Sequence, residues 1–197
     1  MPKLLYQGHG SFRLTAANGA VVFIDPFMGE GYDKPADIIL VSHQHEDHNQ
    51  VNLITRKPGC TVISNVEALA GGKHNTFTLH DIKIEAVEAT NGNHPIDQCV
   101  GFILTVDGLQ LYFSCDTSKT AQMSEFAARK LDYAFLCGDG HYNMSLAEAA
   151  ECAELIGARF NVPVHLKPGA LFDRKLAEQF TGPDRLIIEA GEEVELA

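Results

Sequence analysis

The sequence predicts an α/β protein built as an αββα four-layer sandwich, in which two sheets pack together and helices cover their outer faces. Two observations point to this class. Apolar strand patterns recur in both halves of the chain, and patterns typical of helices follow them in each half. No linker or low-complexity segment separates the halves. We therefore expect the 197 residues to form a single domain, 1–197, of two similar halves, about 1–90 and 91–197.

The first half is predicted to consist mostly of strands. Their patterns are short apolar runs, or runs that alternate apolar and polar residues. The Asn18-Gly19 pair predicts a hairpin turn, and a short helix is expected from about Asn49 to Thr55. The expected strands cover Lys3–Gln7, Ser11–Thr15, Ala20–Ile24, Asp37–Ser42, Thr61–Ser64, Thr76–Leu79 and Ile82–Ala89.

The second half contains the more regular helical patterns. Val100–Val106 and Leu109–Ser114, joined by an Asp-Gly turn, form the clearest hairpin in the sequence. Ser145 and Glu148 have the spacing of a capping box, which begins an amphipathic helix that Gly157 ends. The other expected elements are the strands Tyr133–Leu136, Phe160–Val164 and Arg185–Glu189, and the helices Thr120–Lys130 and Arg174–Phe180.

The composition limits the partners that we expect. The chain carries 15 Lys and Arg against 26 Asp and Glu, a formal net charge of −11, and no basic stripe that a nucleic-acid groove would need. No apolar run approaches the roughly 20 residues that cross a bilayer, and no signal-peptide pattern begins the chain. The five cysteines form no C-x-x-C pair. We therefore expect a cytoplasmic protein with reduced thiols and a small-molecule substrate, acting away from membranes and nucleic acid.

Three of the nine histidines lie within the six residues His43-Gln44-His45-Glu46-Asp47-His48. Residues two apart in a tight loop point to the same side, so His43 and His45 can bind one metal ion. Asp47 and His48 come one turn later and can face a second ion. Imidazole and carboxylate are suitable ligands for Zn²⁺, Mn²⁺ or Fe ions. The alternative is a polar surface loop, in which clustered histidines would gain nothing.

Four residues cannot complete the coordination of two ions, so further ligands must come from later in the chain. His94 lies in a loop between two expected strands. Asp116 and His165 each follow the end of an apolar strand. Catalytic groups of layered α/β proteins collect in such loops. We therefore expect these three side chains to complete the site.

The cluster, the loop histidine, the Cys-Asp-Thr stretch at 115–117 and the Val-Pro-Val-His stretch at 162–165 resemble the metallo-β-lactamase superfamily. The closer likeness is to its small single-domain hydrolases, which include ascorbate-6-phosphate lactonase-like proteins. Weaker matches are Gly8-His9-Gly10-Ser11, Ile24-Asp25-Pro26, Gly138–Met144 and Glu189-Ala190-Gly191-Glu192. The resemblance implies an αββα sandwich with a dinuclear metal site in a wide cleft at one sheet edge. Its first site would be His43, His45 and His94, its second Asp47, His48 and His165, and Asp116 would bridge them.

The expected activity is hydrolysis that depends on two divalent ions, with Zn²⁺ as the first choice and Mn²⁺ or Fe as alternatives. A hydroxide bridging the ions would attack an ester, lactone, amide or phosphodiester bond in a small anionic substrate. Catalytic roles are expected for Asp116, Asp47 and His141. Asp116 would orient the hydroxide, and His141 would donate a proton to the leaving group.

Other polar residues have competing explanations. His9 either contacts the cleft or simply forms a turn, and Asp25 either supports the metal-binding loop or caps a turn. His141 has the alternative of a loop histidine bonded to the backbone. Further candidates, each more simply explained as a solvated side chain, are Lys119, Lys167, Asp139, His74 and His80.

The sequence departs from the superfamily pattern at two points. Cys115 stands where the superfamily usually has glycine, which could alter the loop before Asp116 or place an oxidisable thiol near the ions. After His165 the superfamily branch often continues with an aromatic residue and glycine, whereas this chain has Leu166-Lys167-Pro168-Gly169. Because that loop would line the cleft, no specific substrate is carried over from the resemblance.

Three other functions compete with small-molecule hydrolysis. Diiron redox enzymes of this fold have Glu where His45 stands, together with a flavin domain, and neither is found here. RNA- or DNA-cleaving phosphodiesterases usually add a clamp domain or a basic arm, and this acidic chain has neither. A metal-binding protein without catalysis would be favoured only by a missing ligand. The substrate, the native metal and the oligomeric state are not predicted.

Overall fold

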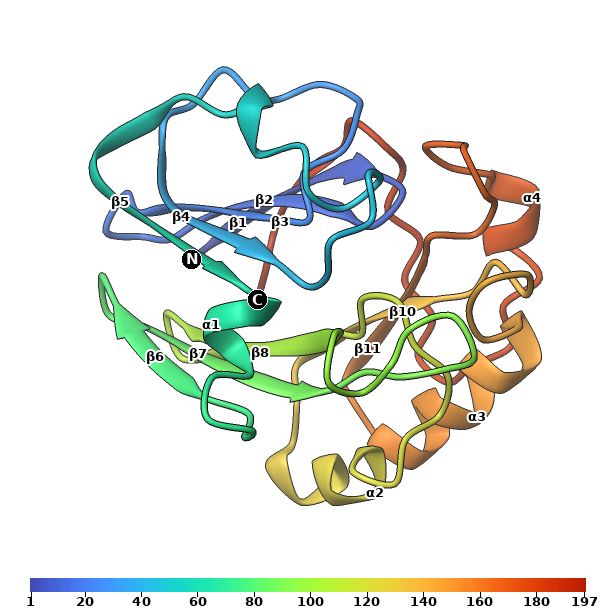
Figure 1. Cartoon of the computed structure of the whole chain (residues 1–197). Helices are drawn as coiled ribbons and strands as arrows, with labels where there is room; N and C mark the ends of the chain where they lie inside the picture. Colours follow the sequence, from blue (N-terminus) through green and yellow to red (C-terminus); the bar gives the residue numbers. More distant parts are fainter.

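The computed structural model describes residues 1–197 and consists of two six-stranded sheets that face each other (Figure 1). The predicted sandwich is confirmed, although helices are few. The first sheet has the order β12 (Glu193–Glu195), β1 (Lys3–Gly8), β2 (Ser11–Thr15), β3 (Val21–Ile24), β4 (Ala36–Val41) and β5 (Arg56–Ser64). The second has the order β11 (Phe160–Val164), β10 (Tyr133–Cys137), β9 (Leu109–Phe113), β8 (Val100–Val106), β7 (Ile82–Glu88) and β6 (Thr76–Leu79).

A core of 27 buried residues fills the space between the sheets. Aromatic rings join the two layers: Phe12 of the first sheet packs against Phe113 and Phe135 of the second, with ring centroids 5.0 and 5.1 Å apart. Burial of apolar surface on this scale is the main term that favours the folded state. The two sheets therefore hold each other in place and fix the loops at their common edge.

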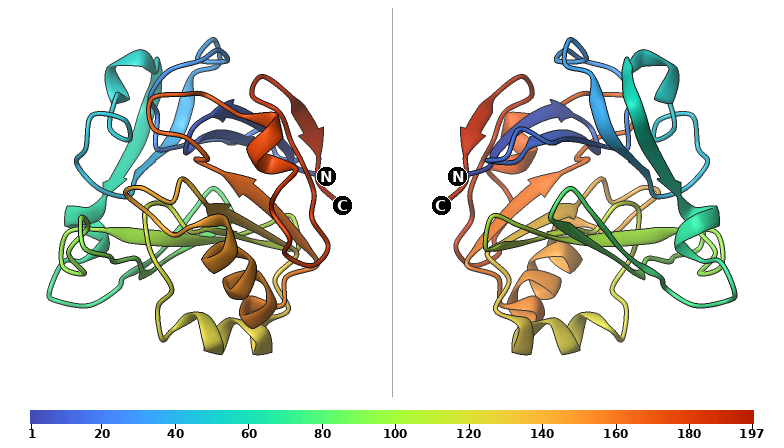
Figure 2. Two further views of the ribbon diagram at one scale, coloured as in Figure 1. Left: turned by 90° about the vertical axis from the view of Figure 1, so that its right-hand side faces the viewer. Right: turned by 90° about the vertical axis from the view of Figure 1, so that its left-hand side faces the viewer.

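The outer faces of the sheets are covered in different ways. Below the second sheet lie α2 (Met123–Phe126), which continues into the 3-10 turn η2 (Ala127–Arg129), and α3 (Leu146–Ile156), as both views of Figure 2 show. The outer face of the first sheet carries only loops and the 3-10 turn η1 (Val51–Leu53). The remaining helices, α1 (Asn65–Ala68) and α4 (Arg174–Ala177), are single turns.

The long helix α3 follows from its sequence as predicted, with one difference at its start. The Ser145 hydroxyl accepts a hydrogen bond from the backbone N–H of Glu148 at 3.2 Å, and Gly157 ends the helix in the left-handed conformation. The Glu148 carboxylate accepts from the backbone N–H of Lys119 at 2.9 Å instead of returning to Ser145. Only one of the two hydrogen bonds of the expected capping box is therefore formed, and the Glu148 side chain instead anchors the loop before α2.

Several predicted elements differ from the structure. The strand expected at Arg185–Glu189 is wrong: only one isolated bridge forms there, between Asn161 and Arg185. The last strand is instead β12, which pairs antiparallel with β1. The helix expected at Thr120–Lys130 is reduced to α2 and η2, and Lys130 ends it with a φ of 56°. The helices expected at 49–55 and 174–180 are likewise reduced to η1 and α4, and α1 was not predicted.

The strand directions bring several strand ends to one edge of the sandwich. β3, β4 and β5 are parallel in the first sheet, and β9, β10 and β11 are parallel in the second. β7 runs antiparallel to β8, which runs antiparallel to β9, so β7 ends at the same edge. The loops that follow these strands contain the predicted ligands. Ligands of α/β proteins bind at the carboxyl ends of strands for this reason.

Two further features bear on the sequence-based expectations. All five cysteines are free thiols, as expected from their scattered positions. None of the helices combines the length and the apolar character needed to cross a membrane.

Candidate metal centre

The histidine-rich loop begins directly after β4 and is held there by Asp25, which follows β3. The Asp25 carboxylate accepts hydrogen bonds from the backbone N–H of Ser42 at 2.7 Å and from the Ser42 hydroxyl at 2.6 Å. Its second oxygen also lies 2.9 Å from Nδ1 of His48. Asp25 therefore fixes both ends of the loop that runs from Ser42 to His48, which favours the supporting role over a simple turn cap.

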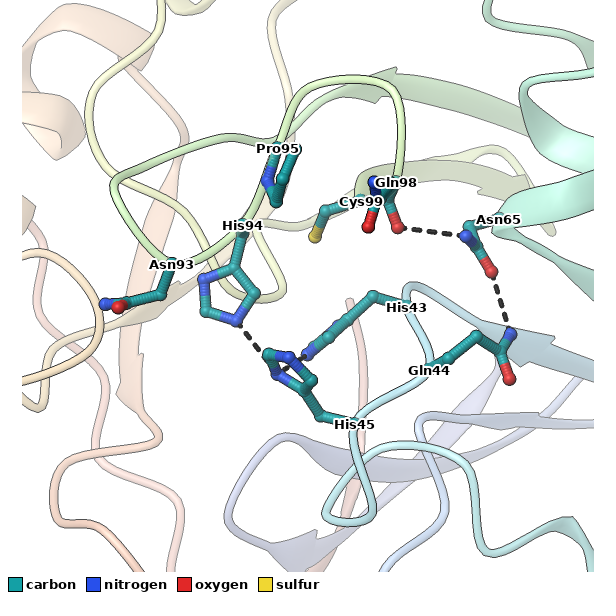
Figure 3. A pocket seen from close by; sticks show the side chains of 9 residues that line it. All are labelled: His43, Gln44, His45, Asn65, Asn93, His94, Pro95, Gln98 and Cys99. Carbon is teal, nitrogen blue, oxygen red and sulfur yellow. Dashed lines mark hydrogen bonds between the residues drawn. The ribbon is translucent and has the colours of Figure 1, made fainter.

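His43, His45 and His94 form the first group of possible ligands. Their facing nitrogens lie within 4.8 Å of one another. Nε2 of His43 is 3.0 Å and Nε2 of His94 is 3.3 Å from Nδ1 of His45, and the three rings point toward a common point (Figure 3). The Ser42 hydroxyl is 2.9 Å from Nδ1 of His43 and orients its ring. These are the three side chains that the resemblance assigns to the first ion.

Asp116, His48 and His165 meet on the other side of this group. One carboxylate oxygen of Asp116 is 3.3 Å from Nε2 of His48 and 3.5 Å from Nε2 of His165. The other oxygen is 3.5 Å from Nε2 of His94. Asp116 thus turns one oxygen toward each group of histidines, which is the arrangement that a bridging ligand needs.

Asp47 lies beside this second group and contacts His9. Nε2 of His9 is 3.1 Å from Asp47 Oδ2, and Nδ1 of His9 is 3.2 Å from the carbonyl of Ala170. The ring of His9 also packs on that of His165, with centroids 3.6 Å apart. Facing atoms of His9, Asp47, His48 and His165 all lie within 4.8 Å of one another. His9 is therefore buried against the centre and holds the half-exposed Asp47, which is more than a turn residue does.

Three buried atoms at the centre lack hydrogen-bond partners, and this shows whether the residues suit a metal ion. His48 Nε2, Asp116 Oδ1 and His165 Nε2 are shielded from solvent and have no hydrogen-bond partner. Buried polar atoms without a partner are costly and rare in native proteins. These three face one another, and imidazole nitrogen and carboxylate oxygen are ligands that Zn²⁺ and similar ions prefer. A shared cation satisfies all three at once, so the residues fit the metal centre.

Asp139 is a supporting residue that the sequence offered only as a weak candidate. Its buried carboxylate lies 3.1 Å from Nδ1 of His165, within ion-pair distance, although this contact lacks the hydrogen-bond geometry of the Asp25–His48 pair. A carboxylate behind a metal-binding histidine fixes the ring and increases its basicity. Asp139 comes two residues after β10, just as Asp116 comes three residues after β9. The strand-end rule that selected Asp116 would have selected Asp139 as well.

The backbone at the centre is held in an uncommon conformation. His9, Asp25, Cys115 and His165 have φ values of 56°, 45°, 52° and 48°. The left-handed region is unfavourable for residues other than glycine, and such strain concentrates at functional sites. Cys115 therefore occupies a position whose backbone suits glycine, which explains why the superfamily usually has glycine there.

The electrostatics of the centre are dominated by burial and by its carboxylates. Burial, to which the charge of His48 adds, lowers the pKa of His43 to about 3, so this ring is neutral at pH 7. Burial also favours a neutral Asp116, but His165 and His48 outweigh it and hold the pKa of this carboxyl well below its usual range. In His48, burial opposes the charged form, yet Asp116 and Asp25 raise its pKa above the ordinary value.

A cleft of about 410 Å³ opens over the centre. Its lining comprises His45, Asp47, Asn93, His94, Asp116, Tyr142 and His165. A smaller cavity of about 150 Å³ adjoins it on the side of His43 (Figure 3). Apart from the histidines, its lining comprises Gln44, Asn65, Asn93, Pro95, Gln98 and Cys99. Neither cavity is lined by Lys or Arg.

The other candidates from the sequence lie outside this lining. His141 is exposed and its ring packs on Tyr142, which lines the cleft in its place. Its proton-donating role stays a prediction. Lys119 pairs with Glu151 at 3.0 Å, and Lys167 is exposed. His74 and His80 belong to none of the ligand groups.

Comparison with known proteins adds two findings from sequence. The beta-lactamase superfamily domain matches residues 3–165. A UPF0173 metal-dependent hydrolase of Thermococcus kodakarensis is similar over its full length, at 30% identity and with all of both chains covered. The match therefore includes every predicted ligand.

Solved structures show the same fold. A protein of Parabacteroides distasonis, described as a candidate metal-dependent hydrolase, is 31% identical, with a TM-score of 0.76 and coverage of 94% of this chain and 92% of that one. A candidate zinc-dependent hydrolase of the metallo-β-lactamase superfamily from Thermotoga maritima gives a TM-score of 0.69 at 21% identity, covering 96% and 99%. At this lower identity, the second likeness shows the fold alone.

Proposed function

The chain belongs to the UPF0173 family of the metallo-β-lactamase superfamily, whose curated members are named metal-dependent hydrolases, and we propose that it is a hydrolase with a dinuclear metal centre. One observation carries this proposal. Three buried ligand atoms without hydrogen-bond partners face one another, and a second group of three histidine nitrogens lies beside them. The Asp116 carboxylate stands between the two groups.

We assign the two ions to the residues that the resemblance implied. His43, His45 and His94 would hold the first ion, Asp47, His48 and His165 would hold the second, and Asp116 would offer one carboxylate oxygen to each. Zn²⁺ is the best match to this donor set, with Mn²⁺ and Fe as the alternatives. When bound, such ions act as Lewis acids and lower the pKa of water from 15.7 to about 7.

The side chains in the cleft orient the reactants. Asp116 stays ionised, because its pKa is held well below the usual range, and can accept a hydrogen bond from the attacking water. Asp47 is held by His9 at the edge of the cleft and accepts a hydrogen bond in the same way. The side chain of Tyr142 forms one wall. Proton donation to the leaving group by His141 is part of the proposal and requires this exposed side chain to turn toward the cleft.

The lining of the cleft indicates the class of substrate. An anionic substrate was expected, but no basic side chain lines either cavity, so a negative charge would meet only the metal ions. Beyond the ions, the substrate meets the carboxamides of Gln44, Asn65, Asn93 and Gln98 and the ring of Tyr142. We therefore propose an ester, lactone or phosphodiester whose remainder is polar and uncharged. A phosphorylated sugar lactone, as in ascorbate-6-phosphate lactonase-like proteins, gains no support from this lining.

Cleavage of RNA or DNA is the less favoured activity. Nucleic-acid binding depends on basic side chains that contact phosphates. The cleft has none, and the chain carries a net charge of −11.

The proposal is tested by a hydrolysis screen with Zn²⁺-loaded protein. The panel contains lactones, carboxylic esters, thioesters, phosphodiesters and β-lactams, and a matched pair, 4-acetoxybenzamide and 4-acetoxybenzoate, compares a neutral with an anionic group. We expect turnover that needs Zn²⁺, is absent in Asp116→Ala, and is faster with the neutral member of the pair. Equal rates with metal-free protein would contradict the metal-dependent mechanism, and a preference for the anionic member would contradict the substrate class.

A further inference from the structure

A chain of polar contacts, three hydrogen bonds and one ion pair, begins at the ring nitrogen of His94 that faces away from the metal centre. Nδ1 of His94 lies 2.8 Å from Oδ1 of Asn91, which also accepts the backbone N–H groups of Asn93 and His94. These two backbone donors fix which amide atom of Asn91 is the oxygen. His94 therefore carries its proton on Nδ1, and its Nε2 lone pair is free for a cation.

The chain continues through Asn143 to the other side of the centre. Nδ2 of Asn91 donates to Oδ1 of Asn143 at 3.0 Å, and Nδ2 of Asn143 donates to Oδ2 of Asp139 at 2.7 Å. The same Asp139 oxygen lies 3.1 Å from Nδ1 of His165. Asn91, Asn143 and Asp139, which we call the amide brace, thus connect the outer nitrogens of a ligand at each site.

The amide brace also holds the cleft wall. The other oxygen of Asp139 accepts the backbone N–H groups of His141 and Tyr142, both at 2.7 Å. On the opposite side, Nδ2 of Asn93 donates to the carbonyl of Tyr142 at 3.0 Å. The backbone of Tyr142 is therefore bonded on one side to Asp139, which faces His165, and on the other side to Asn93, which precedes His94. A shift of either histidine would strain the Tyr142 loop and, through it, the other histidine.

Asn143 occupies the middle of the amide brace and has no direct role at the centre. Its side chain bonds to neither ligand and does not line either cavity. It is 9% exposed. Its amide is donor to one neighbour and acceptor from the other, which aspartate, serine or alanine cannot reproduce in this geometry.

We propose that Asn143 is a positioning residue that couples the two metal sites through the amide brace. Ordering of one ligand then favours the binding-competent geometry of the other, and of the Tyr142 wall. This inference rests on the proposed dinuclear centre.

The test is titration of metal-free protein with Co²⁺ in competition with a chelator, followed by the visible absorbance of bound Co²⁺. For Asn143→Ala we expect both Co²⁺ dissociation constants to rise by about tenfold. This is the lower end of the loss in metal affinity that follows removal of a hydrogen-bond partner behind a metal ligand. The matched control is Asn75→Ala, because the side chain of Asn75 also anchors a loop but donates only to the backbone carbonyls of residues 67, 68 and 70. The two Co²⁺ dissociation constants of Asn75→Ala should equal those of the wild type.

A second variant removes a single bond. Asn91→Asp keeps the oxygen that faces His94, replaces the donor to Asn143 with an oxygen and places a negative charge behind His94. A carboxylate behind a metal-binding histidine by itself tightens the first site, whereas coupling predicts that the dissociation constant of the second site rises, although neither His48 nor His165 has lost its own partner. An unchanged constant of the second site would overturn the coupling in folded protein, as judged by circular dichroism. If the wild type itself binds no Co²⁺, the proposed metal centre fails, which is a different result.

Discussion

The two proposed metal sites differ in the groups that stand behind their histidines. At the first site the partners are neutral: a serine hydroxyl behind His43 and an asparagine oxygen behind His94. At the second site the partners are carboxylates, Asp25 behind His48 and Asp139 behind His165. Each site has one ligand that is more exposed, His45 at the first and Asp47 at the second, whereas the other histidines of both sites are buried.

This difference predicts an order of metal binding. A carboxylate partner makes an imidazole a better electron donor and fixes its ring. The first site adjoins both cavities, through His45 and His94, whereas the second borders only the larger one, through Asp47 and His165. We therefore expect the second site to bind its ion more tightly, and the first site to exchange its ion and to meet the substrate.

The largest effect is expected for the residue that the two sites share. Asp116→Ala removes the carboxylate that the two sites share and should lower hydrolysis by about 1,000-fold or more, because metal catalysis contributes several kcal/mol to the transition state. Elemental analysis should find fewer than two ions per chain. Wild-type activity in a folded variant would contradict the bridging position.

The next effect compares one ligand from each site. His165→Ala should weaken the tighter ion by more than about 100-fold, since even the loss of a partner behind a ligand costs ten- to 100-fold. His94→Ala should leave one ion bound, with its affinity lowered by no more than about tenfold through the loss of coupling. The two variants are compared by chelator competition, and the opposite ranking would reverse the assignment of the tighter site.

Removal of a carboxylate partner should give an intermediate effect. Asp25→Asn is expected to weaken the second ion by about ten- to 100-fold, because the amide is a weaker acceptor for His48. Asp37→Asn is the matched control: Asp37 also accepts a backbone N–H, that of Val21, and pairs with Lys57 far from the ions. Equal metal affinities in the two variants would show that the partner's charge does not matter.

The smallest effect concerns the backbone before Asp116. Cys115 has a φ of 52°, a conformation that costs a residue with a Cβ about 1–2 kcal/mol and glycine much less. Cys115→Gly should therefore be more stable than Cys115→Ala by about 1 kcal/mol, measured by chemical denaturation. A less stable glycine variant would mean that packing of the Cβ outweighs the backbone strain.

The ligands could be found from sequence because their signals are local. His43, His45 and His48 lie within six residues. His165 directly follows the apolar strand β11, and Asp116 comes three residues after β9. The amide brace could not be found in this way, since Asn91 and Asn143 are ordinary loop residues until the fold brings them together. Asp139 gave the same strand-end signal as Asp116, but its loop suggested a solvated carboxylate.

The errors in the fold have a similar cause. Arg185–Glu189 has an apolar strand pattern, but the chain there contacts β11 through one bridge only. β12 is three residues long, with glutamates on both sides of a valine, and it exists because β1 offers it a free edge. Short helices end where tertiary contacts stop them, as at Lys130, which periodicity does not report.

The most direct test of the central claim is to count Zn²⁺ per chain as chelators of rising strength are applied. The proposed centre has seven ligands for two ions, and the histidines of one site are backed by carboxylates while those of the other are backed by neutral groups. It therefore predicts two Zn²⁺ ions per chain at first and their release in two separate steps. The first step should abolish hydrolysis while one ion remains bound. A folded chain that binds no Zn²⁺ would contradict the metal centre, and release of both ions in a single step would contradict the difference between the sites.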